Sequence, residues 1–251
     1  MQYSEPINKC RVCRTTKLVE VLDLGDQPPA NSLRQDKNEK FPKIPLVLLF
    51  CETCSTIQLN HTTDPKYLFD HYYWVTGTSS TAVEYSQIFC ERIISRIDFT
   101  KQNFPFIVEV ASNDGTFLKR FVEGGYKVLG IDPAKNVAAL AEQCGIPTIS
   151  QFFNKSVASA INEQYCASSV VIARNVISHV KEIHSVIAGI ADLVGENGLG
   201  VIEFHYTQVI LEELQYDSIY HEHLSYFSLK TINGLLELYG LNIFDVDKSP
   251  V

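Results

Sequence analysis

The chain has 251 residues, of which 45% are hydrophobic and 20% charged, so it can bury a globular core and is not expected to be disordered. Its formal net charge of -8 argues against a nucleic-acid partner, because such proteins usually present a basic surface to the phosphates. The sequence opens without a secretory signal, and no apolar run approaches the roughly 20 residues that cross a bilayer. A cytoplasmic protein that does not enter membranes is therefore expected.

Residues 1–65 are predicted to form a small zinc-binding domain. They carry two CxxC pairs, separated by 37 residues, and the four cysteines are Cys10, Cys13, Cys51 and Cys54. Four thiolates paired in this way can close tetrahedrally around zinc, and a site with four protein ligands is structural. The alternatives are four unrelated cysteines or redox thiols. The long separation between the pairs predicts an inserted hairpin or loop.

Residues 66–103 are predicted to form a helical connector or lid. A helix over about 80–97 is expected, since Val83, Ile93 and Ile97 partly follow helical spacing.

Residues 104–251 alternate short apolar runs with helical patterns, which predicts an α/β fold. The predicted strands are 106–110, 127–131, 148–152, 170–173 and 199–204, and the predicted helices are about 115–123, 135–143, 155–163, 182–194 and 231–239. Strands that alternate with helices imply a largely parallel sheet covered on both faces, a Rossmann-like arrangement.

The first predicted strand runs into a tight turn and a helix, which together form a nucleotide cradle. Its sequence, Ile107-Val-Glu-Val-Ala-Ser-Asn-Asp-Gly115, follows an ExGxGxG pattern at Glu109 and Gly115, whereas Ala111 and Asn113 replace glycines. S-adenosylmethionine (SAM) has no pyrophosphate that needs those glycines, which favours SAM over NAD as the cofactor.

The ends of the later strands supply further candidate cofactor contacts. Asp132, followed by Pro133, is placed to accept hydrogen bonds from ribose hydroxyls, although Asp-Pro is also turn chemistry. Phe152 could flank the adenine ring or belong to the core. Asn175 and His179 follow the fourth strand, at the edge where ligands bind; alternatively they are a helix cap and a surface histidine.

A cluster after the fifth strand, Tyr220-His-Glu-His223, has the residue types for general base catalysis. Histidine is the natural base near neutral pH, a carboxylate such as Glu222 can fix its tautomer, and a tyrosine hydroxyl can stabilise an oxyanion. The set suits removal of a proton from carbon next to a carbonyl. A metal site that includes Asp217, or a polar loop, are the alternatives.

Taken together, these motifs resemble the sugar C-methyltransferases that methylate the carbon beside the keto group of nucleotide-linked deoxysugars. The matching stretches are 21–31, 51–59, 64–69, 72–79, 109–115, 175–180 and, most specifically, 219–227. The resemblance implies a zinc-binding N-terminal domain, a SAM-binding Rossmann-like domain and a C-terminal domain that helps to hold the nucleotide sugar.

The resemblance also implies roles for individual residues. His223 would remove the proton beside the ketone and Tyr220 would stabilise the enolate, with Glu222 orienting and His179 near the substrate. The segment with Tyr73, Gly77 and Thr78 would close over SAM.

Two departures leave other functions open. Ala111 stands where glycine is usual, and the chain stops at Val251, about where the substrate domain of the family begins. The alternatives are a methyltransferase with another small-molecule acceptor and a non-catalytic zinc- and SAM-binding module of a larger assembly.

Overall fold

The computed structural model describes residues 3–33, 36–97, 105–165 and 167–250. Its contacts divide the chain into two compact units. Unit 1 comprises Met1–Leu68, Ile177–His184 and Phe204–Asn242, and unit 2 comprises Phe69–Val176, Ser185–Glu203 and Ile243–Val251. The domain boundaries predicted at residues 65 and 103 stay a prediction, and residues 98–103 of the predicted connector lie outside the described residues.

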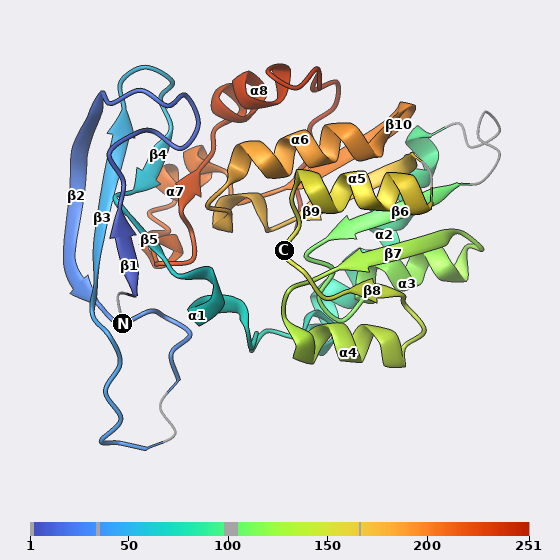
Figure 1. Cartoon of the computed structure of the whole chain (residues 1–251), viewed down its shortest axis with the longest axis horizontal. Coiled ribbons are helices and arrows are strands. Elements are labelled where there is room, and N and C mark those ends of the chain that lie inside the picture. Colours follow the sequence, from blue (N-terminus) through green and yellow to red (C-terminus); the bar gives the residue numbers. More distant parts are fainter. Residues whose placement is uncertain (1–2, 34–35, 98–104, 166, 251) are drawn as a thin grey trace. The chain divides into compact units, whose positions relative to one another are not determined.

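Unit 1 is built on a four-stranded antiparallel sheet in the order β11 (Ser225–Tyr226), β4 (Ile57–Leu59), β3 (Ile44–Cys51) and β2 (Leu18–Gln27). The insertion predicted between the two cysteine pairs as a hairpin or loop is a hairpin of β2 and β3 (Figure 1). A second small sheet pairs β1 (Ser4–Pro6) with β5 (His61–Thr63).

The core of unit 1 joins the N-terminal strands to segments more than 150 residues later. Its buried members are Leu46, Leu48, Leu59, Ile210, Leu224 and Tyr226. The later segments contain α7 (Thr207–Glu212), η4 (Tyr216–Ser218) and α8 (Leu229–Glu237), and η3 (Ile177–His179) lies in the middle segment. α8 begins with a capping box in which the Ser228 side chain accepts the backbone N–H of Thr231.

Unit 2 contains a five-stranded parallel sheet in the order β10 (Val194–Glu203), β9 (Ser168–Arg174), β6 (Phe106–Val110), β7 (Lys127–Ile131) and β8 (Thr148–Ile149). The prediction of a Rossmann-like α/β fold is confirmed. The order reverses between β6 and β9, and ligands bind at such a switch point, beyond the carboxyl ends of the strands. β8 is shorter than the predicted strand 148–152.

The helices of unit 2 cover a sheet whose central strand is buried at every position. They are α2 (Ser80–Arg96), α3 (Thr116–Glu123), α4 (Lys135–Gln143), α5 (Lys155–Gln164) and α6 (Ile183–Leu193). Phe89 of α2 and Phe117 of α3 make an edge-to-face contact in the core that also holds Ile107 and Ile172. The remaining short helices are α1 (Pro65–Phe69) and η1 (Thr76–Thr78).

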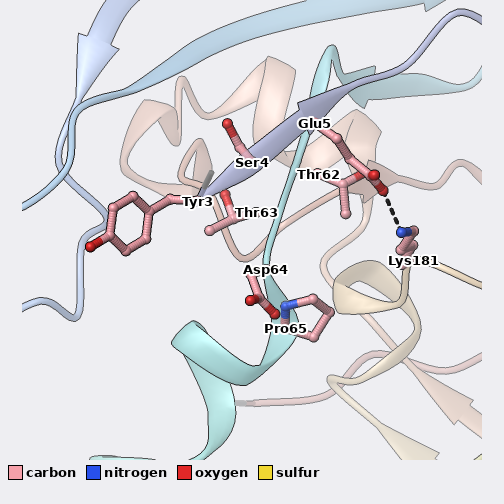
Figure 2. A pocket seen from close by; sticks show the side chains of 8 residues that line it. All are labelled: Tyr3, Ser4, Glu5, Thr62, Thr63, Asp64, Pro65 and Lys181. Atoms are coloured by element: carbon pink, nitrogen blue, oxygen red, sulfur yellow. Dashed lines mark ion pairs between the residues drawn. The ribbon is translucent and has the colours of Figure 1, made fainter. Parts of the chain in front are cut away.

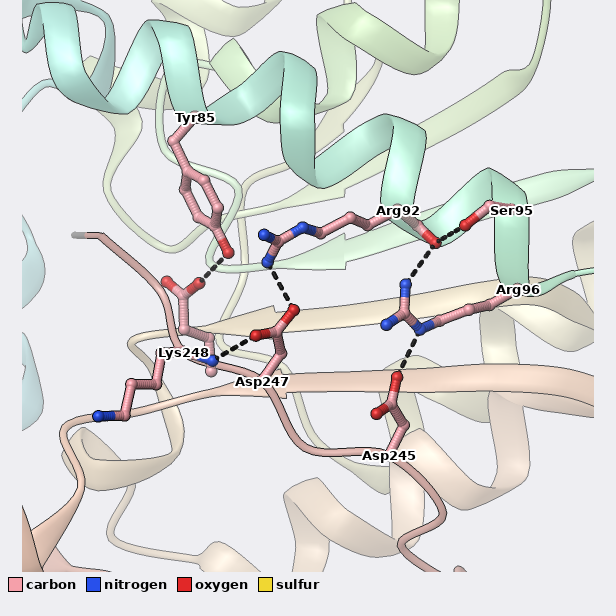
Figure 3. A network of polar contacts seen from close by, with 8 residues as sticks. Tyr85, Arg92, Ser95, Arg96, Asp245, Asp247 and Lys248 are labelled. Carbon is pink, nitrogen blue, oxygen red and sulfur yellow. Dashed lines mark hydrogen bonds and ion pairs between the residues drawn. The ribbon is translucent and has the colours of Figure 1, made fainter.

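The last described segment of unit 2 is extended and runs along α2 (Figure 3). Arg92 pairs with Asp247 at 2.7 Å and Arg96 with Asp245 at 2.6 Å. Both pairs are partly exposed, so each contributes at most about 1 kcal/mol. In the part of the chain that the structure describes, none of the helices has the length and apolar character to cross a membrane.

Candidate functional site

The four paired cysteines of unit 1 converge on one point. Their Sγ atoms all lie within 4.8 Å of one another, with Cys10 and Cys54 at 3.6 Å and Cys13 and Cys51 at 3.5 Å. Four sulfurs about 2.3 Å from a zinc ion in a tetrahedron lie about 3.8 Å apart, so these residues fit the metal. The cluster is a structural zinc site, as the spacing predicts.

Neighbouring groups support the thiolates. Gln58 donates to Cys10 Sγ at 3.3 Å and accepts the backbone N–H of Arg11 at 2.9 Å. The hydrogen bond with Cys54 lowers the pKa of the Cys10 thiol to about 4, which favours the thiolate that zinc requires. The buried Arg11 guanidinium donates to Thr62 and to the carbonyls of Leu59 and His61.

The predicted cofactor loop in unit 2 adopts the backbone of a glycine-rich turn with a glycine at only one of its three left-handed positions. Ala111, Asn113 and Gly115 all have a left-handed backbone, with φ of 56°, 52° and 77°. Such a conformation costs an ordinary L residue about 1–2 kcal/mol, and strain of this kind gathers at ligand sites. The loop therefore keeps the path expected of the ExGxGxG pattern.

Asp132 lies directly after β7 and is buried. Its Oδ1 accepts the backbone N–H of Ala134 at 2.9 Å, and its Oδ2 accepts that of Asn113 at 2.9 Å. The carboxylate thus closes the turn at Pro133, as the turn interpretation expects, and also ties this turn to the cofactor loop. Each oxygen keeps a second lone pair with which a ribose hydroxyl can be bound.

The segment 72–78 is fastened to the cofactor loop by side chains of that loop. Asn113 accepts the backbone N–H of Thr76 at 2.9 Å and donates to the Trp74 carbonyl at 3.0 Å. Asp114 accepts the N–H of Gly77 at 2.9 Å. This arrangement brings the predicted cofactor residues Tyr73, Gly77 and Thr78 to the loop.

Two buried polar atoms at this loop match the requirements of a bound polar cofactor. Among the described residues, Glu109 Oε2 and Ser112 Oγ have no hydrogen-bond partner. Burial raises the pKa of Glu109 to about 8. Uncompensated buried polar atoms are costly, so a ligand or water is expected to satisfy them. The residues present therefore fit SAM.

The other predicted cofactor residues lie at the same edge of the parallel sheet. Phe152 follows β8 and is partly exposed, and Asn175 follows β9 with φ of 47°. The Asn175 amide donates to Glu203, which also pairs with Arg174 at 2.9 Å. The Arg174 guanidinium in turn lies 3.3 Å from the centre of the Phe117 ring.

The catalytic residues predicted from sequence belong to unit 1. His223 is 2% exposed, and its ring lies 4.8 Å from that of His179 and 4.1 Å from that of Tyr220. The Nδ1 atom of His223 is 2.8 Å from the carbonyl oxygen of Ser218, which can only accept, so Nδ1 carries the proton. The Nε2 atom therefore presents its lone pair and accepts the Tyr220 hydroxyl at 2.9 Å.

Burial lowers the pKa of His223 to about 4 and that of His179 to about 3, because the charged imidazolium is poorly solvated. His223 is therefore neutral at physiological pH and can accept a proton. Glu222 is also buried, and its Oε1 accepts from the Asn31 amide at 2.5 Å. The orienting role expected of Glu222 stays a prediction; the hydrogen bond on His223 Nδ1 comes from the Ser218 carbonyl.

A separate pocket of about 260 Å³ opens in unit 1 (Figure 2). Polar side chains of β1 and β5 line it, together with Lys181, which forms an ion pair with Glu5. None of the predicted site residues lines this pocket.

Two residues near these sites, Asn136 and His205, were not predicted from the sequence. Asn136 of α4 accepts the backbone N–H of Tyr72 and donates to its carbonyl, at 3.1 and 2.7 Å, so it holds the start of the segment 72–78. The ring of His205 lies 5.1 Å from that of His223. An isolated Asn or His carries no motif, so only the fold reveals these two.

Comparisons with known proteins agree with this architecture. Residues 10–69 match the model of a zinc binding domain, and residues 83–246 match the model of a methyltransferase domain. The C-methyltransferase NovU of Streptomyces niveus is 32% identical over 248 residues, which cover 98% of this chain. The chain spans 59% of the length of NovU.

Two solved structures share the fold. A SAM-dependent methyltransferase from Archaeoglobus fulgidus superimposes with a TM-score of 0.53 at 13% identity, covering 67% of this chain and 80% of its own. The plantazolicin methyltransferase BamL gives a TM-score of 0.50 at 13% identity, covering 64% of this chain and 63% of its own. The chain therefore belongs to the methyltransferase domain family, with the Rossmann-like fold of SAM-dependent methyltransferases and a zinc-binding domain before it.

Proposed function

We propose that this protein transfers a methyl group from SAM to a carbon of a nucleotide-linked keto-deoxysugar, at the position next to the ketone. The observation that carries the proposal is the pair formed by the buried His223 and the half-buried Tyr220, in which the Nε2 lone pair of the imidazole accepts the phenol hydroxyl at 2.9 Å. The likeness to a C-methyltransferase supports carbon as the acceptor atom.

The first chemical step assigned to this chain is removal of a proton from the sugar carbon. His223 Nε2 takes this proton, and the Ser218 carbonyl holds Nδ1–H so that the ring keeps one tautomer and orientation. The base is neutral before the reaction because burial holds its pKa at about 4. The positive charge that forms on the ring is paired with the negative charge that forms on the substrate.

Tyr220 is proposed to stabilise the enolate. In the structure its hydroxyl is hydrogen-bonded to His223. When the ketone binds, this O–H turns to the keto oxygen, where it donates to the developing oxyanion and frees Nε2 for the proton. His179, whose ring lies 4.8 Å from that of His223, lies beside the substrate carbon in this proposal.

The cofactor is assigned to unit 2. When bound, SAM would supply an electrophilic methyl group to the enolate carbon, and the products would be the methylated sugar, S-adenosylhomocysteine and one proton. Asp132 and the turn at Pro133 would hold the ribose hydroxyls, Phe152 would flank the adenine and Asn175 would border the cofactor. The loop of Glu109, Ala111, Asn113 and Gly115 cradles the cofactor, with Tyr73, Gly77 and Thr78 closing over it.

We place the reaction in the cytoplasm, as expected from the sequence, because cysteines stay reduced there and are able to bind zinc. The test is mass spectrometry of a thymidine-diphospho-4-keto-6-deoxyhexose incubated with the protein and SAM. One added methyl group on a carbon supports the proposal. If this acceptor stays unchanged while another carbon acid or an oxygen acceptor from a panel is methylated, the proposed substrate class is wrong.

A further inference from the structure

The buried base must release a proton in every catalytic cycle. In the proposed reaction one proton leaves the sugar carbon and none is consumed, so His223 has to lose it before the next turnover. His223 is 2% exposed, and its Nδ1–H is already committed to the Ser218 carbonyl. The proton therefore leaves from Nε2 through a neighbouring group.

Four rings surround His223 within unit 1. Those of Tyr220 and Tyr226 lie 4.1 and 6.2 Å away, and those of His179 and His205 lie 4.8 and 5.1 Å away. Burial raises the pKa of Tyr226 above the usual range of a phenol, so this hydroxyl does not relay a proton as a base near neutral pH.

The two histidines differ in their access to water. Burial lowers the pKa of His179 to about 3, which opposes a proton on its ring. His205 is exposed, so water can solvate its charged form and take the proton away. His205 thus has its ring 5.1 Å from that of the base and is itself exposed to solvent.

The position of His205 is fixed by its chain neighbours. Phe204 packs edge-to-face against Phe227 with ring centres 5.9 Å apart, and the backbone N–H of Thr207 donates to the Phe227 carbonyl at 3.0 Å. Tyr206 forms a bridge with the same residue. The backbone on both sides of His205 is therefore anchored.

From this geometry we infer that His205 is the proton relay of the base: it takes the proton from His223 Nε2 and passes it to water. The inference rests on the proposed function, because the relay is needed only if His223 removes a proton. His205 acts through His223 and is not assigned a contact with the substrate.

The test compares His205→Gln with the wild type, using the keto sugar above and SAM. The first turnover, measured in a rapid-mixing experiment, is expected to change less than twofold, because His223 starts unprotonated. Steady-state turnover is expected to fall roughly a hundredfold, the lower end of the effect of a proton-transfer group, and added imidazole should restore it. His61→Gln, the same change elsewhere in unit 1, is the control and should match the wild type.

The outcomes separate the relay from the proposed function. A wild type that neither methylates nor exchanges protons of the keto sugar overturns the proposed function and the relay with it. An active wild type whose His205→Gln variant turns over equally fast, or loses first and later turnovers equally without rescue by imidazole, overturns the relay alone. An NMR titration tests the pair without substrate. The pKa of His223, which burial and charge repulsion from His205 both lower, should rise in the His205→Gln variant.

Discussion

The Gly77 backbone N–H donates to Asp114 Oδ2 at 2.9 Å, at a place where a side chain on residue 77 would collide with that oxygen. A Cβ atom built on Gly77 lies 2.6 Å from Asp114 Oδ2 and 3.0 Å from Thr116 Oγ1. Glycine therefore permits the close approach of segment 72–78, the predicted lid, to the cofactor loop, and a larger residue at this position would have to displace Asp114.

Gly77→Ala is expected to weaken SAM binding, since the added methyl group displaces the lid segment from the loop. A tenfold rise in Kd, about 1.4 kcal/mol, is the expected size. Calorimetry with SAM measures it. Gly234→Ala is the control, because a Cβ there meets nothing within 4 Å. Equal affinities in the folded Gly77→Ala variant and the wild type would refute the lid assignment.

Zinc removal is expected to destabilise the protein, because the metal holds four cysteines from two separate segments. Cys51→Ser should lose the bound metal and about 5 kcal/mol or more of unfolding free energy. Native mass spectrometry and denaturant unfolding test both effects. Cys144→Ser changes an exposed thiol and should retain one zinc ion per chain with unchanged stability. A stable, metal-free Cys51→Ser protein would contradict a structural zinc.

Glu109→Gln is expected to increase stability at pH 8 and to have little effect at pH 5. Burial raises the pKa of Glu109 to about 8, so the folded state keeps this carboxyl protonated where the unfolded state has lost the proton. The unfolding free energy therefore falls as the pH rises from about 4.5 to 8, by roughly a few kcal/mol, and glutamine removes this loss. Urea unfolding at several pH values measures the difference, and parallel curves for variant and wild type would rule out a buried neutral Glu109.

His223 has the opposite dependence on pH. Because burial lowers its pKa from 6.5 to about 4, the unfolded state binds a proton in this window that the folded state does not. The unfolding free energy is expected to fall as the pH drops from 6.5 to 4, by about 3 kcal/mol for this residue. His223→Gln should show a smaller loss on acidification. The same slope in both proteins would indicate a solvent-accessible imidazole.

Features that depend on residues close together in the sequence could be predicted from it. The CxxC spacing predicted the zinc ligands. The apolar run at 106–110 predicted a strand with the same bounds as β6. The cofactor loop was also recognisable, because its strand, turn and helix follow one another along the chain, although Ala111 and Asn113 replace the glycines of the pattern.

Contacts between distant residues could not be predicted. The hydrogen bond of Asn31 to Glu222 joins residues 191 apart, and no local pattern marks either as a partner of the other. Arg174 and Glu203 pair only because β9 and β10 lie side by side in the sheet. The placement of the 204–242 segment in one unit with the cysteine cluster likewise follows from packing.

Enolate formation by His223 is tested by hydrogen exchange of the keto sugar in heavy water, with S-adenosylhomocysteine in place of SAM so that no methyl group is transferred. The wild type is expected to exchange the hydrogen on the carbon next to the ketone, and a folded His223→Gln variant is expected not to. Exchange at the wild-type rate in His223→Gln, or methyl transfer from SAM by a wild type that shows no exchange, would contradict an enolate formed by this histidine.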